Sequence, residues 1–139
     1  MSVRAEVLNI LERVFRQHGF ASLLLRKADI SKEEMGLASE IVYGTIRNKT
    51  LLEEQWRPFT KHVKPRVAAL LNMSVYQLLF LDSIPSYAVI FEAVELAGKS
   101  EKEFVNAVLR KVQKQGLKKP EGNTIEELAV LTSHPLWIL

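Results

Sequence analysis

The 139-residue sequence contains no cysteine, which excludes disulfide scaffolds, cysteine-ligated zinc sites and cysteine nucleophiles. Its charges nearly balance, with 19 Lys and Arg against 16 Asp and Glu, for a net charge of +3. Hydrophobic residues make up 47% of the chain, too many for an intrinsically disordered protein. A chain of this length buries roughly 68% of the surface that its unfolded form exposes, so we expect one hydrophobic core that is stable without a metal ion or a disulfide bond.

Long apolar runs are also missing. Arg4 and Glu6 stand where a signal peptide needs an apolar run. The longest uncharged stretch, residues 67–81, contains Asn72 and Gln77, and it is shorter than the about 20 apolar residues of a membrane-spanning helix. We therefore expect a soluble, cytoplasmic protein in which residues 67–81 form a core helix.

The pattern that is present is helical. Apolar residues recur at three- and four-residue steps, with no period-two strand pattern and no internal repeat, which predicts a compact all-α bundle of about seven helices. The expected helices run from residue 3 to near Gly19, through 23–27, from Asp29 or Ser31 through 46, from 50 to about 61, from Pro65 to 81, from Ser86 to 97 and from Ser100 to Gly116, with a last short helix at 124–131.

Proline and glycine mark several boundaries of these helices. Pro58 should kink or break the fourth helix, because proline removes a backbone donor and clashes with the preceding turn. Pro65 suits the first turn of the next helix, and Gly116 should end the seventh. Gly44 lies inside the third helix at a cost near 1 kcal/mol relative to alanine, which suggests that another helix passes close to it.

Serines are the expected N-caps. Ser31 precedes Glu34 at the spacing of a capping box, and Ser100 precedes Glu103 at the same spacing. Ser86 follows a turn and can cap the sixth helix.

The C-terminal segment has a different composition. Residues 118–123 contain Pro120 and Gly122 and are expected to form a surface linker. Residues 136–139 (LWIL) are apolar, whereas the ends of complete domains are usually polar. This segment either folds back on the core or docks on a part that is no longer attached.

No constellation of catalytic residues is evident in the sequence. His18, His62 and His134 are widely separated and lie near expected helix ends or loops, and no HExxH, GxGxxG or GxxxxGKS motif occurs. Neighbouring glutamates such as Glu33 and Glu34 diverge on a helix and are better explained as solvated surface. We predict no catalytic residue, no metal ligand and no cofactor site in this chain.

Positive charge is concentrated near the end of the seventh helix. Five cations and no acid occur in ten residues, at Arg110, Lys111, Lys114, Lys118 and Lys119. On a helix Arg110 and Lys114 share a face, so the cations could follow a phosphate backbone. Alternatively, they complement the helix dipole and keep the surface soluble.

Two smaller basic groups are further candidates, Arg4 with Arg13 and Arg16 on the first helix, and Arg47 with Lys49. The aromatic residues fall mostly on apolar faces and are expected in the core rather than as base-stacking platforms. They are Phe15, Tyr43, Trp56, Phe59, Tyr76, Phe80 and Phe104.

Asn106 lies among apolar residues of the seventh helix, so we expect a buried amide that must find a partner. It bonds either a neighbouring helix terminus or loop, which fixes the packing, or a ligand.

Several segments resemble the NusB-type helical domain in order and spacing over most of the chain. They are residues 68–71 (AALL), 76–81 (YQLLFL), 84–85 (IP), 92–97 (EAVELA) and 104–110 (FVNAVLR). Within that superfamily, the N-terminal domain of the RsmB (Sun/Fmu) small-subunit rRNA cytosine-C5 methyltransferases is more similar. The similarity lies in residues 40–47 (EIVYGTIR), 106–110 (NAVLR) and 133–137 (SHPLW). In free-standing NusB the Asn of the second segment would be followed by Gly and its Leu by an acidic residue, and the chain would end before the third segment.

The resemblance implies a fold of two small helical subdomains, about 1–60 and 61–132, followed at 133–139 by the start of a linker to an absent methyltransferase domain. It implies an RNA-binding, substrate-positioning domain of an enzyme whose S-adenosylmethionine site and two cysteines lie elsewhere, so that this chain is not catalytic by itself. Ribosomal RNA and the methyltransferase domain of the same protein are the implied partners. The alternative is a free-standing antitermination factor of the NusB type that binds RNA and a ribosomal protein.

The resemblance implies RNA contact by the first helix, where Arg4 matches the start of the NusB helix and Arg13 and Arg16 are further candidates, although the dense arginine cluster of the NusB first helix is missing here. The other basic groups are candidates from their charge alone. Phe91 stands where the family usually has Asn, so packing is expected to replace a polar network there. Asn106 and Gly44 are expected to be structural.

Overall fold

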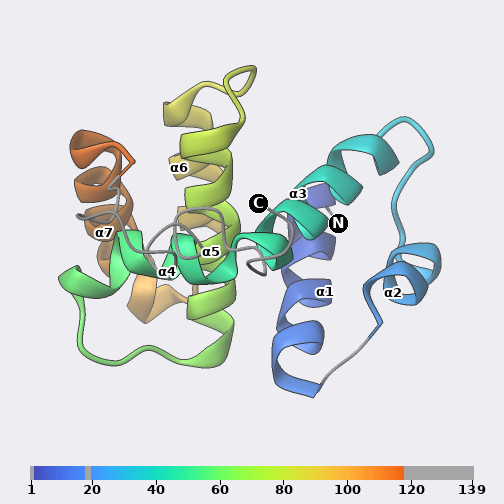
Figure 1. Cartoon of the computed structure of the whole chain (residues 1–139), viewed down its shortest axis with the longest axis horizontal. Helices are drawn as coiled ribbons and strands as arrows, with labels where there is room; N and C mark the ends of the chain where they lie inside the picture. Colours follow the sequence, from blue (N-terminus) through green and yellow to red (C-terminus); the bar gives the residue numbers. More distant parts are fainter. Residues whose placement is uncertain (1, 18–19, 118–139) are drawn as a thin grey trace, which may run out of the picture.

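The computed structural model describes residues 2–17 and 20–117, and in this part of the chain it contains seven α-helices and no strand, as predicted (Figure 1). Two short 3-10 helices, Arg57–Phe59 and Lys99–Glu101, precede α5 and α7. The α-helices are α1 (Val3–Gln17), α2 (Ala21–Lys27), α3 (Met35–Arg47), α4 (Lys49–Trp56), α5 (Pro65–Phe80), α6 (Ser86–Leu96) and α7 (Lys102–Gln115). The expected helix at 124–131, the linkers at 118–123 and 133–139, and the apolar segment 136–139 lie outside the described residues.

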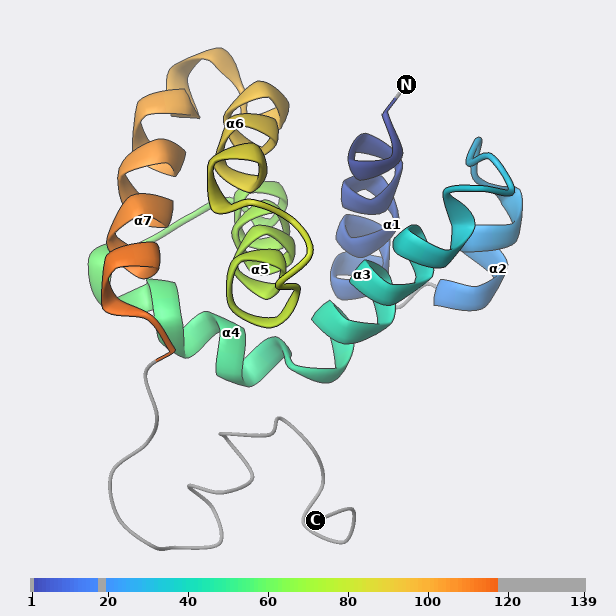
Figure 2. The same cartoon turned by 90° about the horizontal axis from the view of Figure 1, so that it is seen from above.

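Helix α5 is the centre of the bundle. It packs against α1, α3, α4, α6 and α7, and every residue from 69 to 77 is buried. Figure 2 shows α6 and α7 as an antiparallel pair on one side of α5, and α1, α2 and α3 on the other. A helix enclosed on all sides must be apolar around most of its circumference, which explains the long uncharged stretch in the sequence. The division into subdomains near residue 60 stays a prediction.

The boundaries set by proline and glycine are confirmed. Helix α4 ends at Trp56, and Pro58 lies in the 3-10 turn that follows. Pro65 is the first residue of α5, and Gly116 ends α7 with a φ of 72°, in the left-handed region that favours glycine.

The close approach at Gly44 is also confirmed. A Cβ atom built on Gly44 would overlap the ring of Tyr76, which lies across α3 at this point. The Tyr76 hydroxyl then donates a hydrogen bond to Oε2 of Glu40 at 3.1 Å. Gly44 therefore allows α3 and α5 to pack with a tyrosine ring directly against the α3 backbone.

The predicted serine caps are only partly correct. The Glu34 amide donates to Oγ of Ser31 at 3.2 Å, as in a capping box, although α3 itself begins at Met35. The prediction is wrong for Ser86 and Ser100, neither of which caps a helix. Pro85 already has the extended backbone of an N-cap, so Ser86 is the first residue of α6, and Ser100 is taken up in the 3-10 turn before α7.

Trp56, the largest fully buried side chain of the core, belongs to a polar network. Its indole nitrogen donates to Oδ1 of Asn72 at 2.7 Å, and Nδ2 of Asn72 donates to Oε2 of Glu53 at 3.1 Å. Burial alone would raise the pKa of Glu53, but the Asn72 amide and the neighbouring cations Lys49 and Arg57 lower it below its usual value. The network therefore holds a charged carboxylate at the edge of the core.

The expectation that the seven aromatic residues lie in the core holds for most of them but is wrong for two. Trp56 and Tyr76 are buried, whereas Tyr43 and Phe80 are 42% and 37% exposed. Phe91 is 66% exposed, so the packing expected at that position does not occur. The reason is that α7 does not cover α6 completely, and Phe91 lines the open groove that remains between the two helices.

Candidate functional site

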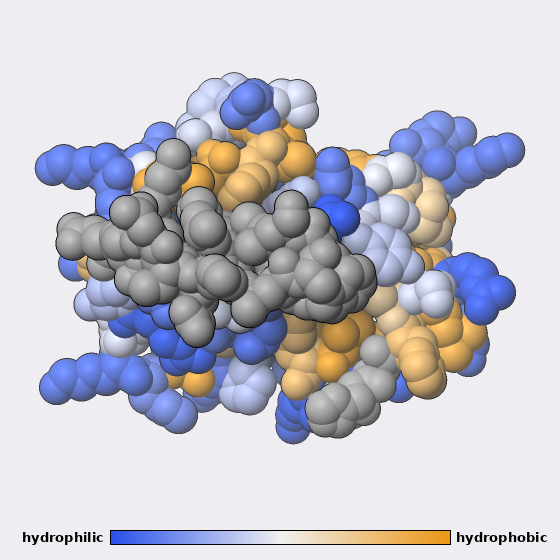
Figure 3. All heavy atoms as spheres, viewed as in Figure 1, coloured by the Kyte–Doolittle hydropathy of each residue, from blue (hydrophilic) through white to orange (hydrophobic). Residues whose placement is uncertain are grey.

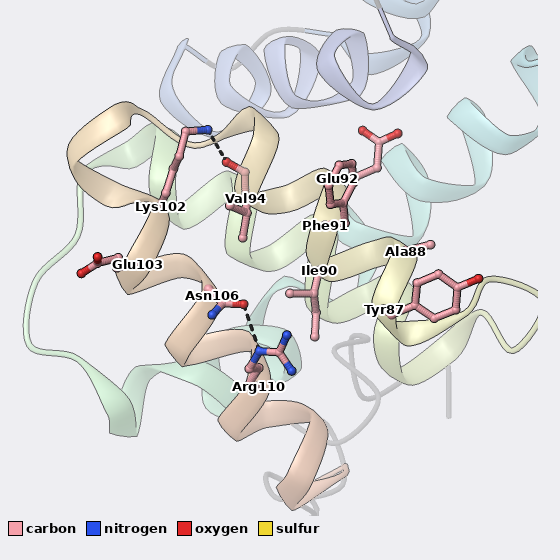
Figure 4. Close-up of a pocket in the computed structure, with 10 residues that line it drawn as sticks. All are labelled: Tyr87, Ala88, Ile90, Phe91, Glu92, Val94, Lys102, Glu103, Asn106 and Arg110. Atoms are coloured by element: carbon pink, nitrogen blue, oxygen red, sulfur yellow. Dashed lines mark hydrogen bonds between the residues drawn. The ribbon is translucent and has the colours of Figure 1, made fainter.

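The described cations of the basic segment in α7 do not form one row. Arg110 points toward α6 (Figure 4). Nζ of Lys111 lies 5.6 Å from the centroid of the Phe59 ring, and Lys114 is exposed one turn beyond Arg110. Lys118 and Lys119 lie outside the described residues. Hydrophilic side chains extend at both ends of the face shown in Figure 3, with apolar patches between them. The described positive charge of α7 is thus divided: Arg110 and Lys114 follow one another along the helix, whereas Lys111 lies against Phe59.

The three arginines of α1 have different environments. Nε of Arg4 donates to Oε1 of Gln77 at 2.7 Å, and its guanidinium lies 3.8 Å from Glu92, with only 15% of the side chain exposed. Arg4 therefore joins α1 to α5 and α6. Arg16 forms an ion pair with Glu12 at 3.4 Å, and Arg13 is exposed.

The third basic group meets internal partners as well. Burial of the Tyr76 hydroxyl together with the charge of Glu40 raises the pKa of Tyr76, and the nearby Arg47 lowers that pKa in part. Lys49 pairs with Glu53 at 3.2 Å. Five of the cations proposed from the sequence have no carboxylate partner in the described chain: Arg13, Arg47, Arg110, Lys111 and Lys114.

A groove of about 760 Å³ runs between α6 and α7, and we call it the α6–α7 groove (Figure 4). Apolar side chains and two exposed aromatic rings from α6 line one wall, and polar side chains of α7 line the other. The lining residues are Tyr87, Ala88, Ile90, Phe91, Glu92, Val94, Lys102, Glu103, Asn106 and Arg110.

Asn106 is half-buried in this groove, and its Oδ1 accepts a hydrogen bond from Nε of Arg110 at 3.1 Å. The bond that we expected to a neighbouring helix or loop is not formed within residues 2–17 and 20–117. The correction has a simple cause: α7 turns this side chain toward the open groove, where its nearest partner is one turn along the same helix.

Tyr87 and Phe91 were missed as functional candidates. Both are strongly exposed, at 78% and 66%, and they are four residues apart on α6. The buried residues of that helix are Val89, Ile90 and Ala93. The sequence signal that could have identified them is the i, i+4 spacing of two aromatic residues next to the buried positions of this helix.

The part of the chain that the structure describes assembles no metal-binding group of three or more His, Asp or Glu residues. Of the three histidines, only His62 is described, in the exposed segment before α5. None of the described helices is long and apolar enough to cross a membrane.

Together, the described residues form an all-helical domain with a packed centre and an open groove between α6 and α7. The family comparison agrees with this class: the model of the NusB family matches residues 1–114, and the chain belongs to that family.

Individual relatives fall into two groups. The chain is 39% identical to a probable ribosomal RNA small subunit methyltransferase B of Bacillus subtilis, over 99% of this chain and 34% of that protein. A second protein of that name, from a Synechocystis strain, is 28% identical over 82% of this chain and 28% of its own length. The transcription antitermination protein NusB of Acetivibrio thermocellus is 30% identical over 71% of this chain and 74% of that protein. The chain thus spans about a third of the methyltransferase relatives and most of the antitermination relative.

Proposed function

We propose that this chain is the RNA-binding, substrate-positioning N-terminal domain of an S-adenosylmethionine-dependent small-subunit rRNA cytosine-C5 methyltransferase, a cytoplasmic enzyme. The observation that carries the proposal is the 39% identity over 99% of this chain to a protein named ribosomal RNA small subunit methyltransferase B. The unpaired cations of α7 support it, because lysine and arginine that face solvent without acidic partners are free to contact phosphates.

The described residues do not fit an S-adenosylmethionine site of the Rossmann type. Such a site needs a glycine-rich turn between a strand and a helix, whereas the described chain is helical and its Gly36 and Gly44 lie inside α3. We therefore assign to this chain the binding and orientation of RNA, and to a further domain the methyl transfer itself.

Binding of the chain to a small-subunit rRNA fragment tests the proposal. Affinity should fall steeply between low and moderate salt, with a slope of about 0.7–0.9 in log–log form for each phosphate contacted. Replacing Arg110, Lys111 and Lys114 together by Gln should weaken binding and flatten the slope.

The matched control replaces Arg26, Lys27 and Lys32, three exposed cations around α2, by Gln. This triple variant removes the same charge and should retain more affinity than the α7 variant. The absence of any binding by the wild-type chain at low salt would refute the proposal.

A second candidate is a free-standing antitermination factor of the NusB type that binds RNA and a ribosomal protein. The match over 74% of the Acetivibrio thermocellus protein favours it. Recovery of a ribosomal protein in a pull-down with this chain would support this candidate. The gene sequence beyond codon 139 discriminates as well, because a reading frame that continues into a cysteine-containing methyltransferase domain would exclude it.

A further inference from the structure

The α6–α7 groove has two chemically different walls. Tyr87 and Phe91 lie four residues apart on α6, which places their Cα atoms about 6 Å apart along the helix axis. Asn106 and Arg110 have the same spacing on α7. One wall therefore presents two aromatic rings, and the other presents two polar side chains one turn apart.

The polar wall offers hydrogen-bond donors. The bond from Nε of Arg110 to Oδ1 of Asn106 uses the only acceptor of that amide side chain and fixes the orientation of the guanidinium. Nδ2 of Asn106 and the terminal nitrogens of Arg110 have no partner among the described residues. Figure 4 shows the guanidinium pointing from α7 toward Ile90 on α6. These free donors suit a ligand that is rich in acceptors.

The acidic residues that line the groove do not oppose such a ligand. Figure 4 shows the carboxylates of Glu92 and Glu103 pointing away from Arg110, and Glu92 lies 3.8 Å from Arg4. Nζ of Lys102 donates to the carbonyl oxygen of Val94 at 2.7 Å, so this lysine covers the C-terminal end of α6. The positive charge that faces the open groove is that of Arg110, and Lys114 adds a second positive charge one turn further along α7.

We infer that the α6–α7 groove binds unpaired nucleotides of RNA, with bases against Phe91 and Tyr87 and acceptor atoms of the phosphates or base edges on Arg110 and Asn106. The inference rests on the proposed function and names the part of the surface that selects single-stranded RNA. A volume of about 760 Å³ lies within the range of small-ligand sites, roughly 300–1,000 Å³. A duplex cannot occupy the groove in this way, because its bases are already stacked on each other.

The test compares the affinity of the full 139-residue chain for an unstructured RNA and for a duplex RNA, by fluorescence anisotropy at several salt concentrations. Phe91→Ala and Tyr87→Ala should each weaken binding of the unstructured RNA at least about fivefold and leave the salt slope unchanged. Arg110→Gln should weaken it and reduce the slope by about one phosphate contact. Phe91→Trp should retain binding, since the larger ring still stacks.

Phe20→Ala is the matched control, because Phe20 is 76% exposed and lies before α2, outside the groove. It should bind as the wild type does. All four groove positions carry exposed or half-buried side chains, so circular dichroism should show a folded chain in every variant.

If the wild-type chain binds rRNA but Phe91→Ala and Tyr87→Ala bind unstructured RNA with wild-type affinity, the inference is overturned and the proposed function stands. If the two variants instead lose binding to a second protein and keep RNA affinity, the groove is a protein-docking surface and the inference is again wrong. If the wild-type chain binds no RNA at low salt, both the inference and the proposed function fall.

Discussion

Substitution of Gly44 by alanine should destabilise the fold, although alanine is the better helix former. The added Cβ would meet Cζ, Oη and Cε1 of the Tyr76 ring, all within overlap distance. The ring has little room to move away, because its hydroxyl bonds Glu40 and the ring stacks on Phe80 with a centroid distance of 5.4 Å. The substitution therefore forces either the ring or the spacing of α3 and α5 to change.

The magnitude follows from two opposing effects. Replacing glycine by alanine within a helix gains roughly 0.5–1 kcal/mol. Overpacking a core typically costs about 1–3 kcal/mol, and a ring held by two further contacts suggests the upper end of that range. We expect Gly44→Ala to lower the free energy of unfolding by about 2 kcal/mol, measured by urea denaturation followed by circular dichroism.

Gly36 provides the control in the same helix, because nothing lies within 4 Å of a Cβ built there. Gly36→Ala should be neutral or stabilising by up to about 1 kcal/mol. Removing the ring supplies a second check, since Gly44→Ala should cost much less in a Tyr76→Ala background. A Gly44→Ala variant as stable as the wild type would refute the packing argument.

Three further substitutions test how buried polar side chains contribute to stability. Because the pKa of Glu53 is lowered in the folded chain, its carboxylate stabilises the fold at pH values above its ordinary pKa, and this contribution is lost as the pH falls through the lowered pKa. Glu53→Gln should therefore make the free energy of unfolding less dependent on pH in the acidic range. Asn72→Ala should cost about 2–3 kcal/mol in urea denaturation, because it leaves the Trp56 indole and Glu53 without a buried partner, and a cost below about 0.5 kcal/mol would contradict the network. The hydroxyl of Thr45 is fully buried without a hydrogen-bond partner among the described residues, so Thr45→Val should be neutral or raise the melting temperature, and a clear loss of stability would show a partner.

The sequence predicted the helices well and their caps poorly. Apolar periodicity and the positions of Pro58, Pro65 and Gly116 are local signals, so they carry through to the structure. Ser86 and Ser100 had the right residue type for a cap, but the neighbouring backbone decided the outcome. Pro85, with an extended backbone, is the N-cap residue of α6, and Ser100 lies within the 3-10 turn over residues 99–101 that precedes α7.

The surface was harder to predict, because helix periodicity does not say which face a neighbour covers. Phe91 and Phe80 lie in apolar segments of the sequence and are nevertheless exposed, since the neighbouring helices do not cover α6 and the end of α5 completely. Arg4 shows the opposite error. It is a cation that the sequence suggested for RNA contact, and the fold uses it to join α1 to α5 and α6.

The sequence by itself determined the all-α class, the central buried helix, the family and the close approach at Gly44, because each depends on residue type and on spacing along the chain. Only the tertiary structure decided which cations remain unpaired and that Tyr87, Phe91, Asn106 and Arg110 line one groove. The reason is physical: the groove exists only when α6 and α7 lie side by side, and their separation and rotation are set by packing on α5, a contact between segments far apart in sequence.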